Sequence, residues 1–134
     1  RLLSRGLGDV YKRQIEYSRN VLNLSDANST EMNNDTSNPV ISLMENQKNI
    51  TEMGGTMRLG SWKCDLIENS LAHKIYSKSK IKERHRHRYE LNFEYMDSLK
   101  SKGLVFSGLN PDTNLVEIIE LENHPWFLGV KFHP

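Results

Sequence analysis

The spacing of apolar residues along the chain predicts three helices. The first begins near Ile15, where apolar positions start to recur at helical intervals. The second covers residues 69–76, with Asn69 or Ser70 as its N-cap. The third covers residues 93–103, with a capping asparagine before it and a glycine at its end.

Short apolar runs bounded by turn residues predict strands between and after these helices. Residues 56–67 are expected to form two short strands with a bend at Gly60, and residues 81–92 are expected to be extended. Residues 25–39, rich in Ser, Asn, Asp and Thr, are expected to form a loop. The remaining predicted strands are residues 40–44, 104–109, 115–121 and 126–134, and the second and third of these are joined by a hairpin turn at 110–114.

The order of these elements indicates the fold class. Helices alternate with strands early and strands dominate late, which favours an α/β fold with a mixed sheet, helices and an antiparallel edge. Arg1–Gln14 has no clean period and no cap signal, and we interpret it as a foreign or artefactual tail; a short disordered basic tail is the alternative. Residues 15–134 are then interpreted as one partial domain.

Composition restricts the classes of function only moderately. The chain has 134 residues, a formal net charge of +1 and 37% apolar residues, which fits one domain or part of one. The near-neutral charge gives no overall attraction to nucleic acid or acidic membranes, and no apolar run approaches the roughly 18 residues of a membrane span. A single cysteine, Cys64, excludes an internal disulfide framework. The cytoplasm is the expected compartment.

The stretch "KERHRHRYELN", residues 82–92, carries the highest density of charge. Strand alternation puts Arg84, Arg86 and Arg88 on one face and His85, His87 and Tyr89 on the other. Buried arginines need carboxylate partners, so the arginine face must meet acids, a ligand or water. Spacing alone favours a solvated basic face. Nucleic-acid binding, a metal site that uses the histidines, and recognition of a carboxylate ligand by arginine stay open as alternatives.

Two histidines and the cysteine are candidates for chemistry. His133 stands at the C-terminal end of the last predicted strand, because Pro134 prevents the ladder from continuing. Ligands of open α/β sheets bind at such strand ends, although spacing alone favours an ordinary surface histidine. His124 precedes a strand and is expected in a plain loop. Cys64 lies in an alternating strand and is expected to be a buried thiol rather than a nucleophile.

Several segments together resemble the glutamine amidotransferase domain of the CTP synthase family. They are, in chain order, "IEYSRNV", "ANSTEM", "GGTMRLG", "ERHRHRYE", "LVEIIE", "NHPWF" and "KFHP", and they extend from Ile15 to Pro134. The "FHP" signal is common to class I glutamine amidotransferases, whereas "GGTMRLG" followed by "ERHRHRYE" is specific to CTP synthases. The resemblance implies the C-terminal part of a flavodoxin-like class I glutamine amidotransferase domain.

The resemblance also implies site residues. This family hydrolyses glutamine with a Cys–His–Glu triad, in which His133 matches the base. The nucleophile's elbow would precede the helix at Ile15 and the acid would follow Pro134, so Cys64 is not expected to be the nucleophile. Glu31 and Arg88 match residues that contact glutamine.

The partners implied by the resemblance are L-glutamine, the synthase domain of the same chain and further copies of a homo-oligomer. The complete enzyme would use UTP, ATP and Mg²⁺ and respond to GTP, whereas no cofactor or metal is expected within these residues. Alone, they are expected to be inactive. The alternatives are another class I amidotransferase, a truncated non-catalytic interaction module and a basic nucleic-acid-binding module; "GGTMRLG" and "ERHRHRYE" argue against the first.

Overall fold

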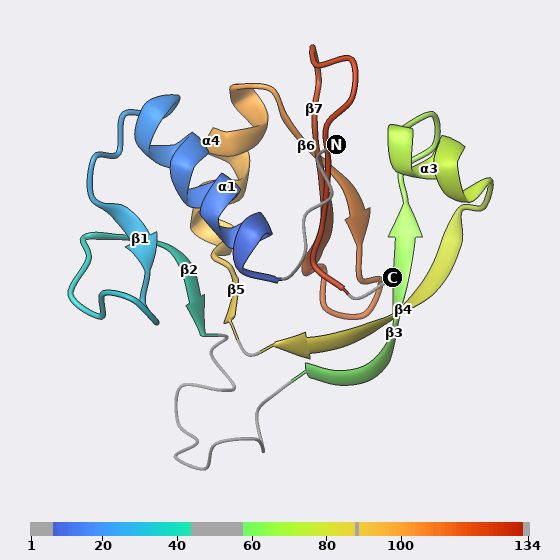
Figure 1. Ribbon diagram of the computed structural model, residues 1–134, viewed down its shortest axis with the longest axis horizontal. Helices are drawn as coiled ribbons and strands as arrows, with labels where there is room; N and C mark the ends of the chain where they lie inside the picture. Colours follow the sequence, from blue (N-terminus) through green and yellow to red (C-terminus); the bar gives the residue numbers. More distant parts are fainter. Residues whose placement is uncertain (1–6, 44–57, 88, 133–134) are drawn as a thin grey trace.

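The computed structural model describes residues 7–43, 58–87 and 89–132 and arranges their strands in two sheets (Figure 1). The smaller sheet has the order β1 (Ala27–Ser29), β2 (Asn38–Leu43) and β5 (Tyr89–Leu91). The larger sheet has the order β4 (Lys80–His87), β3 (Arg58–Leu66), β6 (Leu104–Leu109), β7 (Val116–Leu121) and β8 (Leu128–Val130). Strands β1 and β2 are parallel and all the other described pairs are antiparallel. The predicted α/β fold with an antiparallel edge is confirmed.

The described α-helices are α1 (Leu7–Asn20), α3 (Leu71–Tyr76) and α4 (Met96–Ser101). A 3₁₀ turn, η1 (Phe93–Tyr95), precedes α4. Helices α1 and α4 lie together between the small sheet and strands β6 and β7, whereas α3 lies apart from them, beyond the end of β3 and in contact with β6 (Figure 1).

Two of the predicted helices are confirmed together with their end signals. The side chain of Ser70 accepts a hydrogen bond from the His73 backbone N–H at 3.1 Å, as an N-cap does. The side chain of Asn92 caps η1 in the same way by accepting from the Glu94 N–H at 3.1 Å. Gly103 follows α4 with φ +99°, a left-handed conformation that glycine adopts without strain.

The predicted start of the first helix at Ile15 is wrong, because α1 begins at Leu7. The helix runs unbroken through the expected boundary, where the Ser18 hydroxyl donates to the Gln14 carbonyl at 2.8 Å. Both Gln14 and Ser18 are fully buried. The buried face of α1 therefore includes polar residues, and an apolar period cannot locate it.

Three strand predictions also need correction. The expected loop at 25–39 contains β1 and the start of β2. The expected pair of strands at 56–67 is, over its described residues, one nine-residue strand, in which Gly60 has φ +85° without ending the ladder. The extended segment 81–92 divides into β4 and β5, which belong to different sheets. The residue between these strands, Arg88, lies outside the described residues.

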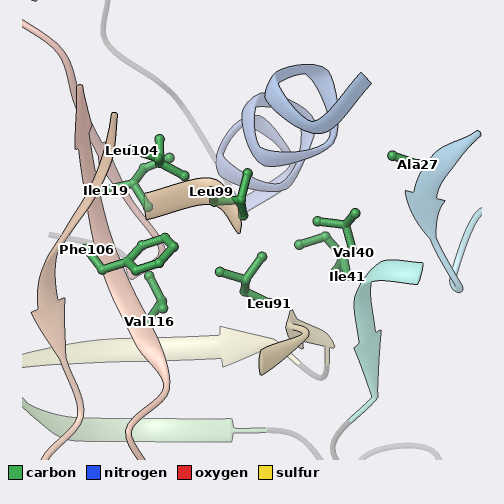
Figure 2. Close-up of a cluster of buried hydrophobic side chains, with 9 residues drawn as sticks. All are labelled: Ala27, Val40, Ile41, Leu91, Leu99, Leu104, Phe106, Val116 and Ile119. Carbon is green, nitrogen blue, oxygen red and sulfur yellow. The ribbon is translucent and has the colours of Figure 1, made fainter. Parts of the chain in front are cut away.

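The main hydrophobic core joins the two sheets beneath α1 and α4. In Figure 2, side chains from β6 and β7 face side chains from β1 and β2, and Leu91 and Leu99 lie between them. The buried members are Ala27, Val40, Ile41, Leu91, Leu99, Leu104, Phe106, Val116 and Ile119. A second cluster brings together Ala72 of α3, Cys64 of β3, Ile118 of β7 and Phe132.

Replacing Gly108 with alanine is expected to lower the unfolding free energy by about 1–3 kcal/mol through overpacking. An added Cβ would lie 2.7 Å from Ile118 Cγ1 and 2.8 Å from Cys64 Sγ, inside the buried second cluster. Chemical denaturation of the two proteins measures the difference. Combining Gly108→Ala with Ile118→Val, which removes a methyl group next to the new Cβ, should recover part of the loss. An unchanged stability in the single variant would contradict the close approach.

Candidate functional site

The two faces of β4 differ in exposure, as the alternation of side chains along a strand predicts. Arg84 and Arg86 are exposed on β4, whereas His85 is 2% exposed on the opposite face. His85 Nε2 lies 2.6 Å from Glu117 Oε2 on β7, and both side chains are buried. The His85 ring also meets the edge of Phe132, with centroids 5.7 Å apart. His85 is therefore a buried link between β4, β7 and the C-terminal segment.

A buried ion pair lies next to the contact between His85 and Glu117. The Lys131 ammonium donates to Glu90 Oε2, and both side chains are almost completely buried. Lys131 Nζ also reaches the Val116 carbonyl at 3.4 Å, and the Lys131 N–H donates to the Glu117 carbonyl at 2.9 Å. Glu90 belongs to the small sheet and Lys131 directly follows β8 of the larger one, so this pair joins the two sheets.

These contacts bring two of the sequence-predicted segments together. Arg88 and His133 themselves lie outside the described residues, and their roles stay predictions. Their neighbours are described: Glu90 is two residues after Arg88, and Lys131 is two residues before His133. The ion pair between Glu90 and Lys131 therefore places β5 against the segment that leads to His133.

Glu31 lies in a tight turn after β1, and its carboxylate is exposed. The buried Ser29 organises this turn. Its hydroxyl accepts from the Glu31 N–H at 3.2 Å, and its carbonyl accepts from the N–H groups of Met32 and Asn33 at 3.0 and 2.9 Å. The turn thus presents the Glu31 side chain to solvent from a hydrogen-bonded backbone.

Asp26 closes the loop that carries Glu31. Its carboxylate accepts from the hydroxyl and the N–H of Ser37 and from the side-chain amide of Asn38. These hydrogen bonds, with the Ser37 hydroxyl first, favour the ionised form and lower the pKa of Asp26 below its ordinary value, to about 2. The two ends of the loop are held together as long as Asp26 is ionised.

The loop is expected to lose this clamp in acid. The pKa of Asp26 is lower in the folded state than in the unfolded chain. The hydrogen bonds to its ionised carboxylate therefore stabilise the folded protein above pH 3.8, and this contribution disappears as the pH falls towards about 2. Titration of the Asp26 side-chain carboxyl carbon by NMR should give a midpoint near 2. Ser37→Ala should move that midpoint up towards 3.8, and a midpoint near 3.8 in the unchanged protein would contradict the clamp.

The other candidates lie apart from these segments. Cys64 is fully buried, as expected for a thiol in an alternating strand, and it packs in the second cluster. His124 is exposed in the turn between β7 and β8, where its Nδ1 accepts from the Trp126 N–H at 3.1 Å. Among the described residues, no group of three or more His, Cys, Asp or Glu side chains could hold a metal ion. No helix in that part of the chain is both long and apolar enough to cross a membrane.

Sequence reasoning missed the roles of Glu90, Glu117 and Lys131. The signal was present in "LVEIIEL", because carboxylates inside an otherwise apolar strand are expensive to bury and therefore mark a partner. Strand β7 is buried along almost its whole length, including Glu117 and Glu120. What the sequence could not supply was the identity of the partners, which come from other strands.

The comparisons with known proteins identify the family. The family model "Glutamine amidotransferase class-I" matches residues 14–134. Because this match covers most of the chain, the chain belongs to the class I glutamine amidotransferases.

Within that family, the similar proteins are CTP synthases. The CTP synthase of Flavobacterium psychrophilum is 69% identical over 120 residues, which are 90% of this chain and 22% of that protein. The CTP synthase of Aquifex aeolicus is 59% identical over 120 residues, 90% of this chain and 23% of that protein. The solved structure of the Trypanosoma brucei CTPS glutaminase domain with bound acivicin matches with a TM-score of 0.85 and 38% identity, covering 93% of this chain and 49% of that one.

These matches define what part of the relatives the chain represents. The chain spans about a fifth of the length of the curated CTP synthases it matches, and its structural counterpart is a glutaminase domain. The predicted class I glutamine amidotransferase fold is confirmed.

Proposed function

We propose that residues 15–134 are part of the glutamine-hydrolysing domain of a CTP synthase. The observation that carries this proposal is the 69% identity to a CTP synthase over 120 residues. The complete protein would form CTP from UTP, with ATP and Mg²⁺, using ammonia released from glutamine. Its GTP activation, homo-oligomeric state and cytoplasmic location are part of the same proposal.

The chemistry proposed for these residues is acid–base catalysis and substrate binding. A cysteine thiolate attacks the glutamine side-chain amide and forms a γ-glutamyl thioester. His133 accepts the thiol proton and then protonates the departing ammonia. Glu31 contacts the substrate's α-ammonium group, and Arg88 helps to hold the glutamine. Fixing the charged end of the substrate places its amide at the nucleophile.

ATP, Mg²⁺ and UTP act in the synthase part of the complete protein. In the part of the chain that the structure describes, no group of three or more His, Cys, Asp or Glu side chains could hold a metal ion. These residues alone are expected to be inactive, because the triad needs a cysteine and a glutamate from flanking sequence.

The test is CTP formation by the complete polypeptide that contains this chain. With UTP, ATP, Mg²⁺ and GTP, glutamine should be converted to glutamate as CTP appears. Glutamine hydrolysis that supports amination of xanthosine monophosphate, or carbamoyl phosphate synthesis from bicarbonate, would instead indicate another class I amidotransferase. No hydrolysis under any of these conditions would favour the non-catalytic interaction module.

Glu31→Gln is expected to raise the KM for glutamine about 10- to 100-fold, because a hydrogen bond to a charged group contributes about 1.5–3 kcal/mol. The kcat should change little if the contact is equally strong in the bound substrate and the transition state. Steady-state glutaminase kinetics measure both constants. Glu68→Gln, also exposed but on the loop before α3, serves as the control. An equal KM in both variants would remove Glu31 from the glutamine site.

A further inference from the structure

The structure suggests how the segment leading to His133 is held. Three kinds of contact converge on Lys131 and Phe132, the two residues that precede His133. The Lys131 side chain pairs with Glu90, its backbone N–H donates to the Glu117 carbonyl, and the Phe132 ring packs edge-on against His85. All five of these residues are at most 3% exposed.

These residues form one connected network, which we call the buried charge network: His85, Glu90, Glu117 and Lys131. The His85–Glu117 pair and the Lys131–Glu90 pair are adjacent, because Lys131 Nζ also contacts the carbonyl of Val116, the residue next to Glu117. The network joins β4, β5 and β7 to the chain that leaves β8.

Burying four ionisable side chains is costly, and apolar residues of similar volume often give equal or greater stability. What a polar network provides instead is a single arrangement, since each group has fixed partners and fixed distances. Here the arrangement that is fixed includes the backbone immediately before the predicted catalytic base and the strand immediately after Arg88.

We propose that the buried charge network positions Lys131 and Phe132, which lead to the predicted base, relative to β5 for glutamine hydrolysis, with Glu117 as the central positioning residue. Glu117 binds the C-terminal segment through its backbone carbonyl and holds His85 against Phe132 through its carboxylate. None of the four residues needs to touch the substrate. The inference rests on the proposed function, because it gives a role to the surroundings of that same site.

The test compares Glu117→Gln with Glu120→Gln in the complete polypeptide. Both residues are buried carboxylates on β7, but Glu120 is three positions further along and accepts instead from the N–H groups of Leu71 and Ala72, at 2.8 and 3.1 Å. The two variants therefore remove the same charge from the same strand on opposite faces. Only the first one touches the network.

Glu117→Gln should lower the kcat for glutamine hydrolysis about 10- to 100-fold, as a displacement of about 1 Å in a catalytic group does. CTP formation from added ammonia should stay unchanged. The pH midpoint for alkylation of the nucleophilic cysteine should rise, because a displaced imidazolium no longer stabilises the thiolate. Glu120→Gln should change neither the kcat nor this midpoint, even if it lowers the melting temperature as much.

A second pair of variants, at His85, tests the same network if Glu117→Gln fails to fold. His85→Gln keeps an N–H donor that can reach the Glu117 carboxylate, whereas His85→Leu removes it. Activity retained in the first and lost in the second, at matched melting temperatures, supports positioning. Equal kcat values and alkylation profiles for the Glu117 and Glu120 variants would overturn the inference. An unaltered polypeptide with no glutaminase activity would instead overturn the proposed function.

Discussion

His133→Ala is expected to abolish glutamine-dependent CTP formation while leaving ammonia-dependent CTP formation intact. General acid–base catalysis contributes about 10²- to 10⁴-fold, and a triad that loses its base loses the activated nucleophile as well. We therefore expect glutaminase kcat to fall by at least about 10³-fold. Added ammonia bypasses this step, because it is the product that the glutaminase site supplies.

The chain offers a closely matched control for this variant. His124 is also followed by proline, but it lies exposed in the turn between β7 and β8. His124→Ala should leave both activities unchanged. Glutamine-dependent synthesis that survives His133→Ala would remove His133 from the catalytic site, and loss of ammonia-dependent synthesis would indicate damage beyond glutamine hydrolysis.

Lys131→Met is expected to destabilise the contact between the two sheets by about 3–5 kcal/mol, because it leaves the Glu90 carboxylate buried without its cation. Glu90→Leu should have a similar effect, because it leaves the Lys131 ammonium group buried without its carboxylate partner. The double variant should be close to the unaltered protein in stability, since it removes both charges and leaves apolar side chains in their place. The two single variants and the double variant form a double-mutant cycle. A coupling energy of several kcal/mol in this cycle would show that Lys131 and Glu90 interact directly.

Hydrogen exchange is the suitable measurement for this cycle, because it reports local opening in a multidomain protein. The amides to follow are those of Lys131, which donates to Glu117, and of Asn92, which donates to the Val40 carbonyl at 2.7 Å next to β5. Lys63→Met, which changes an exposed lysine on β3, should alter protection by less than about 0.5 kcal/mol. Additive single-variant effects would contradict the buried pair.

Elements that depend on local signals were predictable from the sequence. The strand β6 was predicted at the residues where it occurs, and the caps Ser70 and Asn92 were found because a side chain next to the helix provides the hydrogen bond. Each of these features is decided within a few residues of the chain.

Elements that depend on a distant partner were not predictable. Strand β1, "ANS", has no apolar period and exists because β2 pairs with it, extended by the bond from the Thr30 N–H to the Ile41 carbonyl. The division of 81–92 between two sheets depends on β3 on one side and β2 on the other. Strand propensity reflects such surroundings more than the residues themselves.

The candidate site also has a part that the sequence indicated and a part that only the structure revealed. His133, Arg88 and Glu31 came from a resemblance, and of these only Glu31 lies among the described residues, where it is exposed; its contact with glutamine stays a prediction. The buried charge network came from the structure alone. Its four residues are scattered from position 85 to position 131, and no spacing in the sequence indicates which of them pair.

The most direct test of the central claim is to determine the coding sequence on both sides of residues 15–134. If these residues belong to a glutamine-hydrolysing CTP synthase, a glycine-flanked cysteine is expected upstream of Ile15 and a glutamate directly after Pro134. These two residues would complete a triad with His133. A gene that encodes Arg1–Gln14 as they stand, with a stop codon after Pro134, would contradict glutamine hydrolysis by this route and favour the interaction module.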